Sequence, residues 1–216
     1  MHPDTAQSLM DQAALYKNQG KYAEAEPLLK RALAIYEQWL SSEHPDITLT
    51  LIDQAVLALN DQAAKILNDL ALLYVNQEKY TVVEPLYLRA LTICEQRLGA
   101  EHLDTALVLN NLGALYVKQR KYAEAEPLLK RALTIREQQA RAQPPDTAQS
   151  LNNLATLYKN QGKYAEAEPL LKRALAIYEQ RLSSEHPITQ QVLKNYTLLL
   201  QKMESNGEAE DQEEES

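Results

Sequence analysis

Residues 163–182 read KYAEAEPLLKRALAIYEQRL, and this stretch decides the fold. Ala, Leu, Glu, Lys and Arg are good helix formers, and the apolar residues from Ala167 to Tyr178 recur at spacings that place them on one helical face. Pro169 lies near the first turn, where the missing amide hydrogen matters least. The stretch therefore predicts an amphipathic helix from about residue 165 to residue 182.

The same stretch recurs along the chain. Its first thirteen letters, KYAEAEPLLKRAL, also begin at Lys21 and Lys121, and a divergent copy, KYTVVEPLYLRAL, begins at Lys79. Successive copies are 42 residues apart, except that the first two are 58 apart. Residues 2–43 match residues 144–185 at all but six positions, so the chain is an array of duplicated units. The six are His2, Met10, Asp11, Gln12, Ala14 and Trp39.

Each unit contains a second helix ahead of the repeated stretch. In the last unit, DTAQSLNNLATLYKNQ places Leu151, Leu154 and Tyr158 on one helical face, and Gly162 marks the helix end. We call this first helix helix A and the one that follows it helix B. Because both have apolar faces, such a hairpin must stack on its neighbours. We expect four repeats, at residues 2–43, 44–101, 102–143 and 144–185.

This pattern resembles the tetratricopeptide repeat, through small residues such as Ala155 and Ala167 on the facing helices, a late aromatic residue in helix A and the Gly-x-Tyr turn. The 42-residue period with HPDT and LNNLA is similar to the kinesin-light-chain subclass. The resemblance implies an all-α solenoid, a right-handed α-α superhelix of about nine helices. Residues 186–203 are expected to form a capping helix. The acidic residues 204–216 are expected to be a disordered tail, which either solubilises the protein or folds back onto its lysines.

Repeat two carries sixteen extra residues, all within its helix A. Two helix-A-like segments, TLIDQAVL and ILNDLALLY, follow each other with no helix B between them. No Gly or Pro occurs from Asp46 to Val83, and apolar residues continue at spacings of four and three. We expect one extended helix over 46–76, with a break near Asn60 as the alternative. A continuous helix would overhang its neighbours, and self-association is then expected through Ile52, Val56 and Leu59.

Two adjacent positions of helix A carry a row of asparagines. In kinesin light chains such a row holds the backbone of a bound peptide, a role that the resemblance implies for Asn68, Asn110 and Asn152. The next position holds Asn111 and Asn153. A carboxamide donates and accepts hydrogen bonds at once, which suits an extended peptide backbone. The alternative is that these asparagines bond to one another between neighbouring A helices.

Four lysines lie near the same predicted face and would attract an acidic peptide. They are Lys17, Lys65, Lys118 and Lys159. The net charge of the chain argues against nucleic acid as a partner. The formal net charge is -8, but seven acidic and no basic residues lie in 204–216, so the rest of the chain carries only -1. A body without a basic excess offers no continuous footprint for nucleic acid.

Other sequence features argue against catalysis, metal binding and membrane insertion. Cys94 is the only cysteine, and no motif supplies it with a base. The four histidines each begin a repeat, which places them too far apart to share a metal ion. No signal pattern or apolar run of about 20 residues occurs. We expect a cytoplasmic, non-enzymatic protein without metal, cofactor or membrane contact.

The predicted function is a protein–protein interaction scaffold that binds an extended peptide or partner segment in the helix-A groove. One alternative is homo-oligomerisation through the helix at 46–76 and an N-terminal edge that no capping segment covers. Another is that the chain is the sensor fragment of a larger signalling enzyme.

Overall fold

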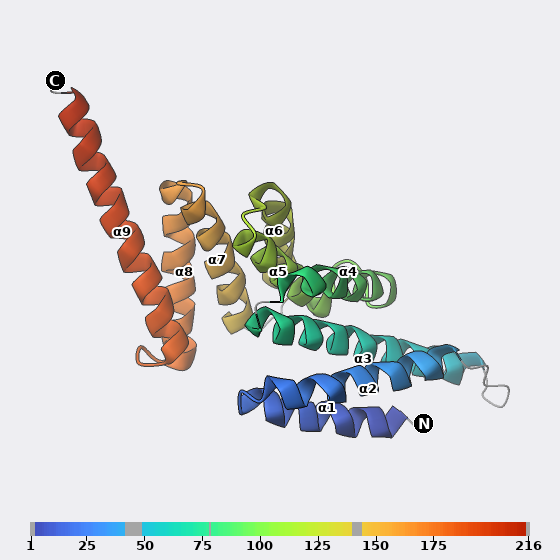
Figure 1. Cartoon of the computed structure of the whole chain (residues 1–216). Helices are drawn as coiled ribbons and strands as arrows, with labels where there is room; N and C mark the ends of the chain where they lie inside the picture. The colour runs from blue at the N-terminus through green and yellow to red at the C-terminus, as the bar shows by residue number, and fades with distance from the viewer. Residues whose placement is uncertain (1–2, 42–48, 78, 140–143, 215–216) are drawn as a thin grey trace. The chain divides into compact units, whose positions relative to one another are not determined.

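The structure is a computed structural model that describes residues 3–41, 49–77, 79–139 and 144–214, with side chains for 4–39, 62–77, 79–139 and 144–205. The described residues form nine helices and no strand, which confirms the all-α prediction (Figure 1). They are α1 (Pro3–Asn18), α2 (Tyr22–Ser41), α3 (Leu49–Asn76), α4 (Tyr80–Arg97), α5 (Leu103–Lys118), α6 (Tyr122–Gln138), α7 (Pro144–Asn160), α8 (Tyr164–Leu182) and α9 (Pro187–Glu214).

The chain divides into two compact units, Met1–Leu115 and Tyr116–Ser216, with the boundary inside α5. In unit 1, α1 packs on α2, α2 on α3, and α3 on α4. In unit 2, α6 packs on α7, α7 on α8, and α8 on α9. Consecutive helices therefore pack in pairs within each unit, as a tetratricopeptide array requires.

Small residues set the close approach of the helices in unit 2. Ala155 of α7 and Ala167 and Ala174 of α8 are fully buried, so the two backbones can come close together. Larger apolar side chains fill the space around them and join α9 to the same core. These include Leu151, Leu154, Leu171, Tyr178, Val192 and Leu199.

The turn between helices A and B has the same hydrogen bond in all four repeats. The amide of the lysine after the turn donates to the carbonyl of a tyrosine five residues earlier, at 2.9 Å, as in Lys163 to Tyr158. The central residue of this turn has a positive φ at Gly20 (72°) between α1 and α2 and at Gly162 (79°) between α7 and α8, a conformation that glycine adopts readily. Between α5 and α6 the same position holds Arg120, with φ 61°.

The extended helix of repeat two is continuous. Helix α3 runs from Leu49 to Asn76 without a break at Asn60, which confirms the extended-helix prediction over the described part of 46–76. At 1.5 Å per residue its 28 residues span about 42 Å. The proposed self-association residues Ile52, Val56 and Leu59 lie on α3, but their side chains lie outside the described part of the chain. Self-association through them stays a prediction.

The C-terminal helix is longer than the sequence suggested. We expected a helix that ends at residue 203 and a disordered tail, whereas α9 continues to Glu214. The compositional argument concerned the lack of apolar side chains to bury, but Glu, Ala and Gln are good helix formers and extend a helix that is already nucleated. Helix α9 packs on α8 through Val192 and Leu199, as a capping helix would.

One leucine of helix A shows where this packing is incomplete. Leu73, Leu115, Leu157 and Leu199 are 42 residues apart and are at most 2% exposed. The matching residue of α1, Leu15, is 62% exposed. Next to it along the same row, Gln12 replaces a leucine that is buried at Leu154 in α7. The first repeat therefore carries one polar and one apolar residue on an uncovered face.

A three-residue contact ties successive repeats together in both units. In unit 2, the Tyr158 hydroxyl donates to Glu126 Oε1 at 3.1 Å, and Lys130 Nζ lies 2.7 Å from the same oxygen. In unit 1, Tyr74, Glu26 and Lys30 repeat this arrangement. The hydrogen bond from Lys130 outweighs burial and holds the pKa of the Glu126 carboxyl below its ordinary value of 4.5.

Candidate functional site

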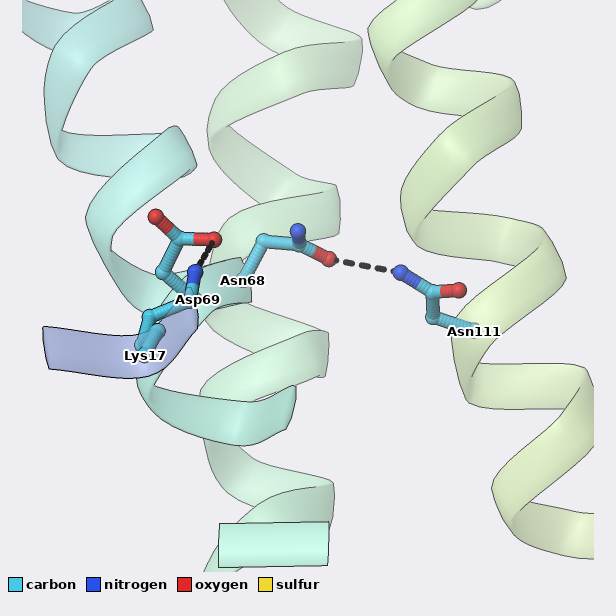
Figure 2. Close-up of polar contacts among 4 residues, drawn as sticks. All are labelled: Lys17, Asn68, Asp69 and Asn111. Carbon is cyan, nitrogen blue, oxygen red and sulfur yellow. Dashed lines mark hydrogen bonds and ion pairs between the residues drawn. The ribbon is translucent and has the colours of Figure 1, made fainter. Parts of the chain in front are cut away.

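In unit 1, one pair of the asparagine row lies between neighbouring A helices. Asn68 of α3 and Asn111 of α5 are 6% and 9% exposed, and Asn111 Nδ2 donates to Asn68 Oδ1 at 2.9 Å (Figure 2). Asn110 is fully buried. A buried amide that bonds across two helices fixes their separation, because leaving either group unpaired would cost about 1–3 kcal/mol. In unit 1 the structure thus favours the helix-to-helix alternative for this pair.

The same contact recurs in unit 2 in a looser form. Asn195 Nδ2 of α9 lies 3.5 Å from Asn152 Oδ1 of α7. Asn152 and Asn153 are only partly buried, so a role for them in binding a peptide stays a prediction. Sequence reasoning missed Asn195, although it stands 42 residues after Asn153 and so occupies the same repeat position.

The four predicted lysines are divided between the two units, with two in each. In unit 1, Lys17 Nζ lies 2.7 Å from Asp69 Oδ1, and both side chains are partly buried, so Lys17 is engaged within the protein (Figure 2). Lys65 lines a separate cavity of the same unit. In unit 2, Lys118 and Lys159 line one shared pocket. Within unit 2 these two lysines are therefore brought together.

The pocket that they share has an unbalanced charge. It measures about 730 Å³, and among the residues whose side chains are described it is lined by four cationic side chains and no carboxylate. We call it the basic pocket; its cations are Lys118, Arg120, Lys159 and Lys202. Tyr122 and Tyr164 also line it and supply apolar surface with a hydroxyl at the tip.

The local fold explains how these cations converge. Lys118 is the last residue of α5 and Lys159 lies in the last turn of α7, where a positive charge also offsets the negative end of the helix dipole. Arg120 lies in the α5–α6 turn, and Lys202 reaches the pocket from α9. Three successive A helices and one turn thus contribute one cation each.

Sequence reasoning missed two of the four. Lys202 stands 84 residues, or two periods, after Lys118, so extending the repeat count beyond residue 185 would have found it. Arg120 stands at a position occupied by glycine in the first and last repeats. That departure from the repeat was the available signal.

The described residues form neither a metal-binding cluster nor a helix suited to span a membrane. In the part of the chain for which side chains are placed, no three His, Cys, Asp or Glu side chains gather closely enough to hold a metal ion. Among the helices as described, none combines the length and apolar character that crossing a bilayer demands.

Comparisons with known proteins give a consistent picture. BtubC (BKLC) from P. vanneervenii is a solved structure with 26% identity and a TM-score of 0.68, and the match covers 87% of this chain and 68% of that one. A putative kinesin light chain of Podosopora anserina with nearly identical TPR-like repeats has 26% identity and a TM-score of 0.66, covering 97% and 92%. No curated protein matches the chain.

Family models add the decisive match. Two models of the tetratricopeptide repeat match residues 5–46, 62–138 and 147–188, which together make up most of the chain. Repeats of this kind generally mediate protein–protein interaction. With its paired helices, its repeated turn and its likeness to kinesin-light-chain-like structures, the chain belongs to the tetratricopeptide-repeat family.

Proposed function

We propose that this protein is a non-enzymatic scaffold that binds an acidic, extended segment of a partner protein in the basic pocket. The observation that carries the proposal is the convergence of four cations, with no carboxylate among the lining residues that the structure describes. Such a surface attracts carboxylates by charge, and its tyrosines can contact apolar parts of a peptide. The partly buried Asn152 and Asn153 are proposed to add contacts to the peptide backbone.

The expected affinity is modest and depends on salt. Each exposed ion pair contributes roughly 0.2–1 kcal/mol, so four contribute about 1–4 kcal/mol. Micromolar binding requires about 8 kcal/mol, so contacts with Tyr122, Tyr164 and the peptide backbone must supply the remainder. Because the cations are largely exposed, raising the ionic strength should weaken binding.

The test uses the full chain and two fluorescein-labelled peptides that differ only in charge, ten glutamates and ten glutamines. Fluorescence anisotropy should show binding of the glutamate peptide alone. The double variant Lys159→Gln/Lys202→Gln should weaken that binding by roughly 2- to 30-fold. A matched control, Lys172→Gln/Arg181→Gln, removes the same charge from exposed residues of α8 that do not line the pocket.

Two results would contradict the proposal. One is equal binding of the two peptides, which would show that carboxylates are not recognised. The other is equal weakening by the pocket variant and the control variant, which would show that only the overall charge of the protein matters.

A further inference from the structure

Unit 1 contains a cavity whose lining residues differ from those of the basic pocket. It measures about 220 Å³ and lies among residues of α1, α3, α4 and α5. Its walls are largely apolar, with polar groups at a few points. Its lining includes Met10, Ala64, Cys94, Asp104 and Val108.

The cavity lies at a helix-B position that is filled by a large side chain in the other repeats. Counting by the repeat spacing, this position holds Tyr36 in α2, Cys94 in α4, Arg136 in α6 and Tyr178 in α8. All four are buried, with at most 5% of each exposed. Repeat two thus has a cysteine, the smallest of the four side chains, at a position that holds tyrosine or arginine in the other repeats.

Contacts of the next repeat show what normally fills this space. Arg136 Nη1 donates to the Asp146 carbonyl oxygen at 2.5 Å and to Ser150 Oγ at 2.7 Å. The equivalent residues one period of 42 earlier are Cys94, Asp104 and Val108. All three line the cavity, which is therefore the counterpart of the space that Arg136 occupies in unit 2.

A second substitution in α4 does not close the gap. Seven residues before Cys94, and so on the same helical face, Tyr87 replaces a leucine found in the other three repeats. Tyr87 is 1% exposed, but it does not line the cavity among the described residues. Its added bulk lies elsewhere, and the space beside Cys94 stays open.

Size and chemistry define what fits. An apolar cavity of about 150 Å³ can hold benzene, so 220 Å³ suits a single ring with a small substituent. Met10, Ala64 and Val108 offer apolar contact. The Asp104 carboxylate, which is 33% exposed and lies 3.9 Å from His102 Nδ1, can accept a hydrogen bond. The other carboxylate in the lining, Asp69, is paired with Lys17.

We propose that this cavity binds a small phenolic molecule, which takes the place of the tyrosine side chain found at this position in two of the other repeats. The ring lies against Cys94 and Val108, and its hydroxyl donates to Asp104. The cavity and the basic pocket share no lining residue, so a variant made at one site changes no lining residue of the other.

The single cysteine makes occupancy measurable. Alkylation of Cys94 by iodoacetamide, followed by mass spectrometry of the full chain, reports access to the cavity because no other thiol can react. With p-cresol at about ten times its dissociation constant, labelling should slow by about tenfold. Toluene has the same ring but no hydroxyl, so it should bind about fivefold more weakly.

Filling the cavity from either wall should abolish the effect. Val108→Phe keeps the thiol, and p-cresol should then no longer slow its labelling. Cys94→Tyr restores the side chain of the other repeats, and p-cresol should no longer raise its melting temperature. Cys94→Ser leaves the space open and should keep that rise. The serine variant also keeps the proposal testable if the tyrosine variant does not fold.

Three outcomes would overturn the proposal. The first is unchanged labelling of the wild type in p-cresol. The second is protection that persists in Val108→Phe, which would place the ligand elsewhere. The third is protection by propylguanidinium but not by p-cresol, which would show that the cavity takes an arginine-like cation and not a phenol.

Discussion

Arg120 combines a strained backbone with a charge in the basic pocket, so its replacement by glycine should separate stability from binding. Its φ of 61° lies in the left-handed region, whereas Gly20 and Gly162 supply this conformation in other repeats. We predict that Arg120→Gly raises the stability of the protein and weakens its binding of acidic peptides.

The magnitude follows from two opposing terms. A left-handed conformation costs a non-glycine residue roughly 1–2 kcal/mol, which the substitution removes. Glycine loses about 0.5–1 kcal/mol more backbone entropy on folding, which offsets part of the gain. The net stabilisation is about 0.5–1 kcal/mol, or a rise of about 1–4 °C in melting temperature for a chain of this size. Loss of one exposed cation should weaken peptide binding by about 1.5- to 5-fold.

Urea titration monitored by circular dichroism and anisotropy with the glutamate peptide would measure both effects. The reciprocal change, Gly162→Arg, is the matched control, because Gly162 also lines the basic pocket and a Cβ built there meets no atom within 4 Å. The double variant Arg120→Gly/Gly162→Arg should regain peptide affinity. A clear fall in the stability of Arg120→Gly would refute the strain argument.

Three further outcomes are expected. Leu157→Ala should cost about 2–5 kcal/mol in urea unfolding, whereas Leu15→Ala, at the matching exposed position, should cost less than about 1 kcal/mol. Because the folded pKa of Glu126 is lowered, its contribution to stability is present above pH 4.5 and lost as pH falls below it, so Glu126→Gln should flatten the acid limb of a pH–stability curve. Deleting residues 206–216 should strengthen glutamate-peptide binding at low salt if the acidic segment competes for the basic pocket.

Most of the fold could be predicted from the sequence because the same helix-forming pattern occurs four times. KYAEAEPLLKRAL predicts each helix B, and the unbroken apolar stripe without Gly or Pro predicts a continuous α3. The predicted end of α9, at residue 203, was wrong by eleven residues. Composition reports what a segment can bury, but a segment attached to an existing helix needs only backbone propensity to continue it.

The site was less predictable because repeat spacing identifies equivalent positions without showing what covers them. Asn68 and Asn152 hold the same position, yet one is buried against its neighbour and the other is only partly so. The space beside Cys94 is also invisible in a single repeat. It depends on the difference between cysteine and the Tyr36 and Arg136 of other repeats, and on what faces them in three dimensions.

The exposed Leu15 makes this chain a convenient starting point for building longer arrays. Helix α8 already covers Leu199 of α9, and residues 144–185 nearly repeat residues 2–43. A copy of 144–185 joined ahead of residue 2, with Gln12 returned to leucine, would place an α8-type surface against Leu15. Each added unit would lengthen the array by one fixed step. The number of units between two binding pockets would then determine the distance between them.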